Sequence, residues 1–502
     1  MKINLLARNI FFSGKKVNVI YFNDMHGSTK NLTSFADAHD EFYKKHKDEP
    51  NYTLCGGDMF LDTSKNNKTV ASVMSKRIDA AAIGNHDLTS VQYFNNLLKQ
   101  YGMKRKWLSA NLYLDKSSNL KKDFNKSIII EKEATKIGVI GVSPLEYRDV
   151  IFLNDENRSV NVMPIDKTCE TIKNEVSKLE KKGVNKIFLI AHTGEYGKNH
   201  EEKYYEKFAK IGGIDVIIGG HDHLQVNKWL VSSRGEPVKV VSTGKSKYKN
   251  FGGNLDVYGI LNLDFDDDGV LIRKDSKNKF VNLKTVHSDK KFSDKALYEL
   301  EKPLKDSNSL LSHSETANLT ADACLWYVNH NTKGPKADFA FVNGGTIRSC
   351  FDNKIVTADD IAGVVPFTTS TLIKAPLSKK QIINTLNWSA LSTSFKKVSP
   401  GLMHTSGMEY TINSDLQVSD VHILNSDGTI KYNLDDFDDN DEFICVYDVF
   451  LATAPAGLKD LKTDCENNQN LEHFNVSRQF ALEEYFKNGQ ISDYTQKRIL
   501  FK

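Results

Sequence analysis

The chain has 502 residues, of which 40% are hydrophobic and 26% charged; 67 Lys and Arg against 64 Asp and Glu give a net charge of +3. This length predicts more than one domain. The small net charge argues against a nucleic-acid-binding surface, and no apolar run is long enough to span a membrane. We therefore expect a soluble, globular protein with no nucleic-acid or membrane partner.

Residues 1–16, MKINLLARNIFFSGKK, contain short apolar patches that are interrupted by Arg8 and Asn9. They lack the continuous apolar core and the small-residue cleavage site of a secretory signal. We interpret them as the start of a cytoplasmic protein. The six cysteines show no CxxC spacing, so neither a disulfide framework nor a cysteine-based zinc site is predicted.

The first part of the chain alternates short apolar strands, polar turns and helix-like segments. The strands and turns that matter most are VNVIYFNDMHG (17–27), YTLCGGDMF (52–60), AAAIGNHDL (80–88), KIFLIAHTGEYG (186–197) and VIIGGHDH (216–223). Strands that alternate with helices predict a layered α/β domain, which we assign to residues 1–288. Residues 255–285 are typical of a hairpin that closes this domain.

A polar, lysine-rich segment follows, and we predict a linker helix over residues 289–309. Beyond it, TADACLWYVNHN (320–331) has a helical pattern. The segments DFAFVN (338–343) and EFICVYDVFLAT (442–453) are typical of strands. These features predict a second, α+β domain of ordinary size over residues 310–502.

Side chains that bind metals follow five strands of the first domain. They are Asp24, His26, Asp58, Asn85, His192, His221 and His223. The carboxyl ends of neighbouring strands in an α/β sheet meet at one edge, so we expect these seven side chains to converge there. Imidazole, carboxylate and amide oxygen together suit Zn, Mn or Fe.

The seven residues divide into two overlapping sets if Asp58 bridges two cations through its two oxygens. The first set is Asp24, His26, Asp58 and His223, and the second is Asp58, Asn85, His192 and His221. Two divalent ions about 3.5–4 Å apart would stabilise an in-line displacement and lower the pKa of a bound water. We expect His221 and His223 to bind different ions, because two side chains that are two residues apart in an extended stretch cannot occupy one position.

Each motif alone has a plainer interpretation. GNHD (84–87) is also typical of a turn before a capped helix, and HDH (221–223) of a solvated turn. All five motifs in order, each after a predicted strand, favour the metal site. We expect His86 to lie near the metals without binding them. There a protonated imidazole would stabilise the transition state or protonate the leaving oxygen, and a structural role is the alternative.

The order of these motifs along the chain resembles that of the calcineurin-like metallophosphoesterases: D-x-H, GD, GNHD, H and GGHDH. Their spacing and the C-terminal unit resemble the 5'-nucleotidase family, and the resemblance extends over nearly the whole chain from about residue 16. It implies an N-terminal four-layer αββα metallophosphoesterase sandwich with a dimetal site. It also implies a C-terminal α+β 5'-nucleotidase-type domain that recognises the substrate.

The second domain contains three segments that are similar to family signatures. FVNGGTIRSCF (341–351) is similar to N-G-G-G-I-R, which implies nucleoside contacts for Asn343 and the backbone at Gly345 and a phosphate contact for Arg348. Phe367 in VVPF and Phe450 in YDVFLAT match the two aromatic residues that stack on the base. Core packing is the alternative for each phenylalanine.

The chain also departs from the family pattern. Ala454-Pro455-Ala456 replaces a Gly-Gly-Asp turn whose aspartate holds the ribose, and the family's upstream substrate arginine is not found in LSHSETANLTAD (311–322). The aspartate partner of the catalytic histidine falls on Thr89, for which Asp87 is our candidate substitute. These departures leave phosphoester hydrolysis as the expected reaction but weaken the expected preference for nucleoside 5'-monophosphates.

The resemblance implies a two-metal hydrolase that converts nucleoside 5'-monophosphates to nucleosides and phosphate by a metal-bound hydroxide. The alternatives are a 2',3'-cyclic-nucleotide phosphodiesterase, a UDP-sugar diphosphatase and a non-catalytic binding protein on this fold. The complete set of metal-type residues argues against the last, and the near-neutral charge argues against a nuclease. DFDDDG (264–269) has calcium-loop spacing, but its hairpin context predicts a β-turn.

Overall fold

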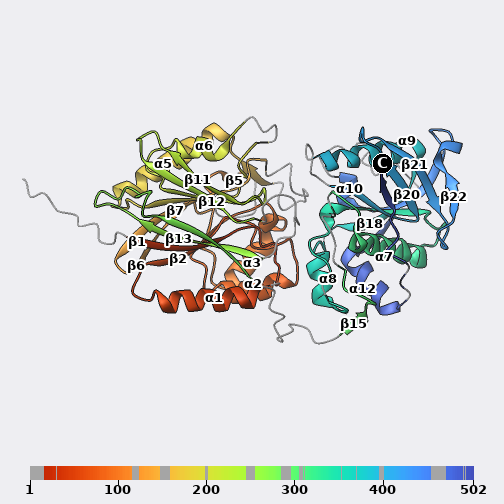
Figure 1. The fold of residues 1–502 in the computed structure, drawn as a ribbon, viewed down its shortest axis with the longest axis horizontal. Coiled ribbons are helices and arrows are strands. Elements are labelled where there is room, and N and C mark those ends of the chain that lie inside the picture. The colour runs from red at the N-terminus through yellow and green to blue at the C-terminus, as the bar shows by residue number, and fades with distance from the viewer. Residues whose placement is uncertain are drawn as a thin grey trace, which may run out of the picture.

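The computed structural model describes the chain in two bodies, which lie side by side in Figure 1. The described residues are 16–29, 31–115, 124–146, 159–197, 202–244, 255–283, 296–304, 309, 311–351, 353–368, 370–394, 401–453, 471–489, 491 and 493–502. The first body ends within the described part at residue 283, and the second begins at residue 296.

The first body contains two six-stranded sheets. One has the order β14-β13-β1-β2-β3-β4 and the other the order β11-β12-β10-β9-β7-β6. The first sheet comprises β1 (Lys16–Phe22), β2 (Asn51–Cys55), β3 (Ala80–Ala82), β4 (Trp107–Leu108), β13 (Val257–Asp264) and β14 (Lys277–Asn282). The second comprises β6 (Ser127–Lys132), β7 (Thr135–Val142), β9 (Ile187–Ala191), β10 (Val216–Gly219), β11 (Val226–Val231) and β12 (Pro237–Ser242).

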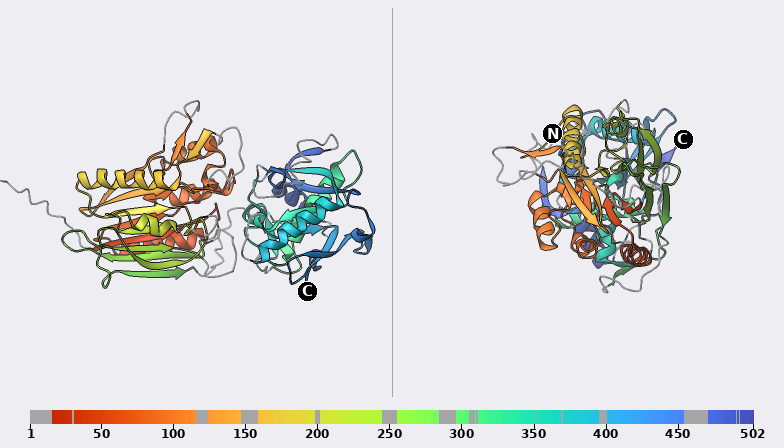
Figure 2. Two further views of the ribbon diagram at one scale, coloured as in Figure 1. Left: turned by 90° about the horizontal axis from the view of Figure 1, so that it is seen from above. Right: turned by 90° about the vertical axis from the view of Figure 1, so that its left-hand side faces the viewer.

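The alternating direction of the side chains along β1 shows how the layers form. Val19 and Tyr21 face the second sheet, whereas Ile20 and Phe22 pack against the helices on the outer side. The outer helices are α1 (Leu32–Lys45), α2 (Asn66–Met74) and α3 (Val91–Gln100) on the first sheet, and α5 (Ile165–Lys181) and α6 (Tyr204–Ala209) on the second. Figures 1 and 2 show the resulting four layers, which confirm the predicted αββα sandwich.

The parallel centre of each sheet points its carboxyl ends in one direction. β1, β2, β3 and β4 run parallel, as do β7, β9, β10 and β12. β2 and β9 are buried along their whole length, which is typical of strands covered on both faces. The antiparallel pair β13–β14 confirms the predicted closing hairpin.

The second body combines a five-stranded sheet, in the order β19-β16-β23-β18-β24, with a four-stranded sheet, in the order β22-β21-β20-β25. Its strands are β16 (Phe339–Asn343), β18 (Thr371–Ser378), β19 (Met403–Ser406), β20 (Met408–Ile412), β21 (Val418–Leu424), β22 (Ile430–Asn433), β23 (Glu442–Asp448), β24 (Glu472–Ser477) and β25 (Ile499–Phe501). Its helices are α7 (Glu315–Asn331), α8 (Ala358–Val364), α9 (Lys379–Ala390), α10 (Val449–Thr453) and α12 (Arg478–Asn488). This arrangement confirms the α+β prediction.

The predicted linker helix is wrong where the structure describes it. Residues Ala296–Glu299 form strand β15, which pairs antiparallel with β17 (Ile355–Thr357). The partner strand lies more than fifty residues later in the chain, so a local pattern of lysines could not reveal it. Most of 289–309 lies outside the described residues, and the domain boundaries at 288 and 310 stay predictions. The segment Ala454-Pro455-Ala456 also lies outside the described residues.

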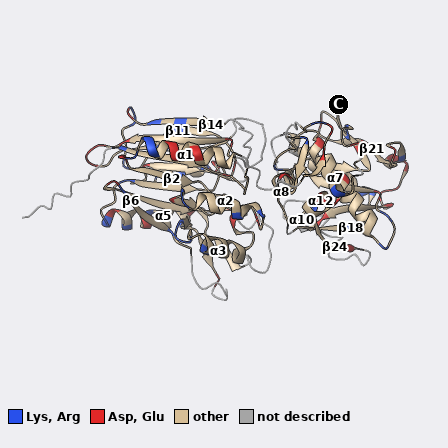
Figure 3. Ribbon diagram, turned by 90° about the horizontal axis from the view of Figure 1, so that it is seen from below, with Lys and Arg blue, Asp and Glu red and all other residues tan. Residues whose placement is uncertain are grey.

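Three smaller sequence expectations, on a turn, on surface charge and on membrane-spanning helices, can be compared with the fold. DFDDDG forms a turn after β13, in which the Asp266 amide donates to the Val270 carbonyl at 3.0 Å and Gly269 has a φ of 86°. These contacts support the prediction that DFDDDG forms a β-turn and not a calcium loop. Lysine and arginine are interspersed with aspartate and glutamate over both bodies in the view of Figure 3. Among the helices described here, none has the length and apolar character needed to cross a membrane.

Candidate metal centre

All seven predicted metal ligands lie just beyond the carboxyl ends of strands. β1, β2 and β3 of the first sheet lead into Asp24, His26, Asp58 and Asn85, while β9 and β10 of the second lead into His192, His221 and His223. Two of the seven side chains, His221 and His223, are half-buried, and the other five are buried. Both sheets of the sandwich therefore contribute to one cluster at the edge that faces the second body.

The backbone of these turns is unusual for residues other than glycine. Five ligand positions have positive φ: Asp24 (54°), His26 (48°), Asp58 (51°), His221 (89°) and His223 (55°). Such conformations are uncommon and cost about 1–3 kcal/mol each, and they cluster at functional sites. The turns also brace one another, because the amides of Asp24 and His26 donate to the carbonyls of Gly57 and Asp58 at 3.0 and 2.8 Å.

Two glycines allow the turns to approach closely. A Cβ atom on Gly57, whose φ is 105°, would lie 2.4 Å from Nδ1 of His192. A Cβ atom on Gly84 would lie 1.9 Å from Oδ1 of Asp58. Because neither contact is sterically possible, both positions require glycine for the ligand side chains to hold their places.

The first predicted set is brought together. Nε2 of His26 lies 3.2 Å from Nε2 of His223, and Oδ1 of Asp24 lies 3.7 and 3.4 Å from these two nitrogens. Oδ2 of Asp58 lies 3.8 Å from Nδ1 of His26. Asp24, His26 and His223 thus present three ligand atoms that could hold one ion.

The second predicted set also converges. Oδ2 of Asp58 lies 3.0 Å from Nε2 of His192, and Oδ1 of Asn85 lies 3.1 Å from Nδ1 of His221. The rings of His192 and His221 have centroids 5.2 Å apart, which joins the two pairs. Asp58 lies near both sets, as expected of a bridging carboxylate.

Two buried nitrogens test whether the cluster fits metal ions. Nδ1 of His26 and Nε2 of His192 are buried and make no hydrogen bond, although Nε2 of His192 lies only 3.0 Å from Asp58. Nδ1 of His192 faces the Gly56 carbonyl at 2.8 Å, so a proton there leaves Nε2 with a lone pair directed at the carboxylates. Buried nitrogens directed at carboxylates fit a divalent cation.

Burial sets the protonation of the imidazoles. It lowers the pKa of His26 and His223, and it lowers that of His221 to about 4. Neutral imidazoles are the form that binds metals. Burial also disfavours charge on His192, but the carboxylates of Asp58 and Asp24 raise its pKa to about 10. The carboxylates that favour a proton on His192 equally favour a metal cation at that point.

His86 lies beside the cluster, as predicted. Its amide donates to Oδ1 of Asp58 at 2.9 Å, and its ring centroid lies 4.9 Å from that of His26. Burial lowers the pKa of His86 to about 3, and the guanidinium of Arg348 contributes to that direction. This direction is opposite to the protonated imidazole that the sequence predicts.

Asp87 requires a correction, because its carboxylate braces the turns in place of the expected partnership with His86. It accepts hydrogen bonds from the amides of Gly84 and Phe60 at 2.9 Å and from that of Asp58 at 3.2 Å. These backbone contacts occupy both of its oxygens. Burial, together with the negative charge of Asp58, raises the pKa of Asp87 to about 7.

The second body places Arg348 and Phe367 against this cluster. The Arg348 guanidinium lies 5.2 Å from the ring centroid of Phe367, and that ring lies 6.2 Å from the ring of His86. Burial lowers the pKa of Arg348 to about 10, while the carboxylates of Asp58 and Asp24 favour its charge. The predicted phosphate-binding arginine therefore faces the predicted metal ligands.

A hydroxyl pair joins the two bodies beside Phe367. The Oγ1 atoms of Thr63, in the loop after β2, and Thr368 lie 2.8 Å apart. Helices α2 and α8 also meet across this boundary. The two threonines were not singled out by the sequence, because nothing local marks a hydroxyl that meets a residue some three hundred positions away.

The remaining predicted substrate residues are Asn343, Gly345 and Phe450 of the second body. Asn343 ends β16 and is buried, and Gly345 lies in the 3-10 turn Gly344–Thr346 that follows. Phe450 lies in α10, is half-buried and packs against the core of the second body. At least part of the Phe450 ring therefore packs in the core, which was the alternative to base stacking. Sequence reasoning missed Arg478, a buried residue that contacts Asn343.

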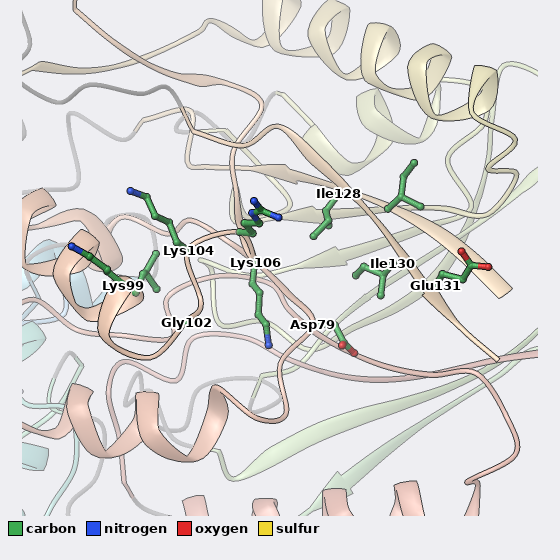
Figure 4. A pocket seen from close by; sticks show the side chains of 11 residues that line it. Asp79, Lys99, Gly102, Lys104, Lys106, Ile128, Ile130 and Glu131 are labelled. Atoms are coloured by element: carbon green, nitrogen blue, oxygen red, sulfur yellow. The ribbon is translucent and has the colours of Figure 1, made fainter. Parts of the chain in front are cut away.

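A separate cavity of about 600 Å³ lies away from the metal centre. Figure 4 shows Lys99, Lys104 and Lys106 on one side of it, and Ile128 and Ile130 of β6 on the other. Lys106 immediately precedes β4, so the cavity lies at the amino ends of the parallel strands. It shares no residue with the candidate metal centre.

Comparison with known families identifies both bodies. The family described as "Calcineurin-like phosphoesterase" matches residues 17–225, which contain all seven predicted metal ligands. The family described as "5'-nucleotidase, C-terminal domain" matches residues 291–463. The second match contains all the predicted substrate residues: Asn343, Gly345, Arg348, Phe367 and Phe450.

Individual relatives agree with these matches. The chain is 28% identical over 306 residues to a trifunctional nucleotide phosphoesterase of Bacillus subtilis (strain 168), across 57% of this chain and 19% of that protein. It is 25% identical over 413 residues to the 5'-nucleotidase of Mus musculus, across 71% of this chain and 68% of the relative. The matched regions span between 19% and 56% of the length of the first three curated relatives.

A solved structure shows the same overall fold. The 5'-nucleotidase precursor from Thermus thermophilus superimposes with a TM-score of 0.73, over 97% of this chain and 99% of that chain. The two sequences are 20% identical, so this likeness concerns the fold.

Proposed function

Because the chain belongs to the 5'-nucleotidase family, with a calcineurin-like phosphoesterase domain followed by a 5'-nucleotidase C-terminal domain, we propose that it hydrolyses nucleoside 5'-monophosphates to nucleosides and phosphate. It is a hydrolase of this metal-binding family, whose members act on phosphorylated small molecules such as nucleotides. The observation that carries the proposal is the position of Arg348 in the opposite body. Its guanidinium lies 5.2 Å from the ring of Phe367, which lies 6.2 Å from the ring of His86 beside the buried Asp58.

Two divalent ions, such as Zn²⁺ or Mn²⁺, are part of the proposal. The proposed ligands are Asp24, His26, Asp58 and His223 for one ion and Asp58, Asn85, His192 and His221 for the other. Such ions, when bound, supply Lewis-acid polarisation of the phosphate ester and lower the pKa of water. The mixed nitrogen and oxygen donors suit several first-row metals, so the chemistry of the site does not select one of them.

The chain's own residues then bind and orient the substrate. Arg348 binds phosphoryl oxygens through its planar fork of N–H donors, which matches phosphate geometry. The ring of His86 lies between the cluster and Phe367, where it can hold or transfer a proton at the leaving oxygen. Burial lowers the pKa of His86, and the negative charge of a bound phosphate would act in the opposite direction and favour the proton. Arg348 and Phe367 come from one body and His86 from the other, so the site is complete only when the bodies meet.

A second candidate function is hydrolysis of 2',3'-cyclic nucleotides or UDP-sugars. The replacement of the family's ribose-binding turn by Ala454-Pro455-Ala456 favours it. The Bacillus subtilis relative is itself described as a trifunctional nucleotide phosphoesterase. A site with fewer ribose contacts would discriminate less between nucleotide esters, because specificity depends on the difference between two binding free energies.

The experiment is a substrate panel in which the products are separated and quantified. AMP and p-nitrophenyl phosphate release phosphate, whereas a cyclic nucleotide gives a nucleoside 2'- or 3'-monophosphate and UDP-glucose gives UMP and glucose 1-phosphate. Metal-stripped protein is assayed with AMP, a 2',3'-cyclic nucleotide, UDP-glucose and p-nitrophenyl phosphate, before and after addition of Mn²⁺ or Zn²⁺. Metal-dependent turnover with AMP as the best substrate would support the proposal. Faster turnover of the cyclic nucleotide or of UDP-glucose than of AMP would select the second candidate. No metal-dependent turnover on any of the four would contradict both.

A further inference from the structure

A buried arginine lies behind the substrate-facing loops of the second body. Arg478 is the first residue of α12, follows the helix cap Ser477, and is only 3% exposed. A charged guanidinium this deeply buried requires hydrogen-bonding partners. Its partners come from segments that are distant in the sequence, so Arg478 joins several loops.

One arm of the guanidinium orients Asn343. Nη1 of Arg478 donates to Oδ1 of Asn343 at 3.0 Å and to Oγ1 of Thr346. The Thr346 hydroxyl donates to the same Asn343 oxygen at 2.8 Å. With two donors on its oxygen, the carboxamide of Asn343 is oriented with its oxygen toward Arg478 and its nitrogen away from it. Asn343 therefore presents N–H donors on the side of the loop opposite to Arg478.

The other arm holds the start of α10. Nη2 donates to Oδ1 of Asp448 at 2.6 Å, and this carboxylate is 2% exposed. Oγ of Ser370 donates a hydrogen bond to Oδ2 of Asp448 at 2.6 Å. The same Ser370 oxygen accepts a hydrogen bond from the amide of Phe450 at 2.9 Å. Ser370 lies three residues after Phe367. The same guanidinium therefore connects to the segments that carry both predicted stacking residues.

We propose that Arg478 is a positioning residue for nucleoside recognition, which it exerts by holding Asn343 directly and Phe450 through Asp448 and Ser370. The inference rests on the proposed function. It concerns the nucleoside part of the substrate, because the network holds Asn343 and Phe450, which match family residues that contact the nucleoside. The planar fork bonds in two directions at once, which a lysine ammonium cannot reproduce.

The test uses Arg478→Lys, which keeps the charge but loses the fork. We expect kcat/KM for AMP to fall about tenfold more than kcat/KM for p-nitrophenyl phosphate, mainly through KM, as for the loss of a well-placed charge-assisted hydrogen bond. Arg498→Lys is a matched control. Arg498 is a buried arginine of the same body, paired with both oxygens of Asp322 at 2.7 and 3.0 Å. We expect its substitution to change both substrates equally.

A double variant separates positioning from the effect of an unpaired buried charge. Arg478→Met combined with Asp448→Leu removes both charges, a change that cores often tolerate. We expect this variant to fold and to show the same selective loss with AMP. Equal losses with the two substrates in either variant would indicate a merely structural role and would overturn the inference.

Binding provides a readout that does not depend on turnover. Calorimetric titration of AMP into metal-free protein should show binding weakened about tenfold in Arg478→Lys, which corresponds to about 1.4 kcal/mol. Unchanged AMP affinity would overturn the inference, and so would an absence of AMP binding by the wild-type chain. Loss of the proposed function has a different signature, namely no metal-dependent turnover of p-nitrophenyl phosphate by the wild-type chain.

Discussion

The metal centre of the first body and the substrate loops of the second are held in place in different ways. The metal-type side chains follow their strands within a few residues, and backbone hydrogen bonds between neighbouring turns brace them. The substrate loops are held by side chains that reach across the fold, with Arg478 contacting Asn343 over 135 positions of sequence. Rigid backbone suits ligands that must hold fixed distances, whereas a side-chain network permits specificity to change by substitution.

This contrast predicts different consequences for substitutions in the two regions. Changes at the metal centre should affect all substrates alike, because every phosphate ester requires the same cations. Changes in the network behind the substrate loops should affect substrates unequally. Arg348 and the hydroxyl pair Thr63–Thr368 lie where the two regions meet, so they test how closely the regions depend on each other.

The largest effect is expected from Gly57→Ala. The new Cβ would lie 2.4 Å from the His192 ring at a φ of 105°, which forces the β2 turn or the histidine to move. We expect a loss of stability of about 2–4 kcal/mol and a loss of activity of at least about 100-fold on all substrates. Thermal unfolding and metal-dependent turnover measure the two effects.

Gly102→Ala is the matched control for that substitution. Gly102 also has positive φ, 68°, but a Cβ atom there would meet nothing within 4 Å. It should cost about 1 kcal/mol of stability from backbone strain and leave turnover intact. If the two variants lost equal activity, strain alone would explain the result, and the close packing of Gly57 against His192 would have no special importance.

The next largest effect is expected from Arg348→Ala. It removes the guanidinium that faces the metal cluster, and we expect kcat/KM to fall about 100-fold, or about 2.7 kcal/mol, for AMP and p-nitrophenyl phosphate alike. Metal content should stay at the wild-type value, because no proposed ligand is lost. A loss confined to AMP would instead assign Arg348 to the nucleoside. Arg77→Ala, which breaks the surface pair with Asp40, is the control and should not change turnover.

The smallest effect is expected from the hydroxyl pair between the bodies. Thr63→Val and Thr368→Val each remove one partner of a 2.8 Å contact, and each should lower kcat/KM about two- to fivefold. The double variant should be no worse than either single variant, because the same hydrogen bond is lost in all three. Additive losses would show that the two threonines act independently and that the contact does not couple the bodies.

Much of the metal centre could be predicted from the sequence because its signals are local. A buried strand, a glycine and a metal-type residue recur together, as in Gly57-Asp58 and Gly84-Asn85, and parallel strands necessarily bring their carboxyl ends together. The alternation of strands and helices predicted a layered α/β domain, and the resemblance to the family implied its four layers. Asp87 was assigned incorrectly because its backbone partners lie on a neighbouring turn, which a search for a histidine partner does not consider.

The parts that could not be predicted depend on long-range contacts. The linker helix was wrong because β15 pairs with β17, which lies more than fifty residues later. Arg478 has no local pattern that distinguishes it from an exposed arginine at the start of a helix. Its burial depends on Asn343 and Asp448, which only the folded chain brings to it.

The most direct test of the central claim measures bound metal and turnover together for the wild-type chain and Asp58→Asn. Protein loaded with Mn²⁺ and passed through a desalting column is analysed by elemental mass spectrometry and assayed with p-nitrophenyl phosphate. We predict about two ions per wild-type chain, with fewer ions and at least about 100-fold lower turnover in Asp58→Asn, because the carboxylate contributes to both proposed sites. Wild-type metal content and wild-type turnover in Asp58→Asn would contradict the account.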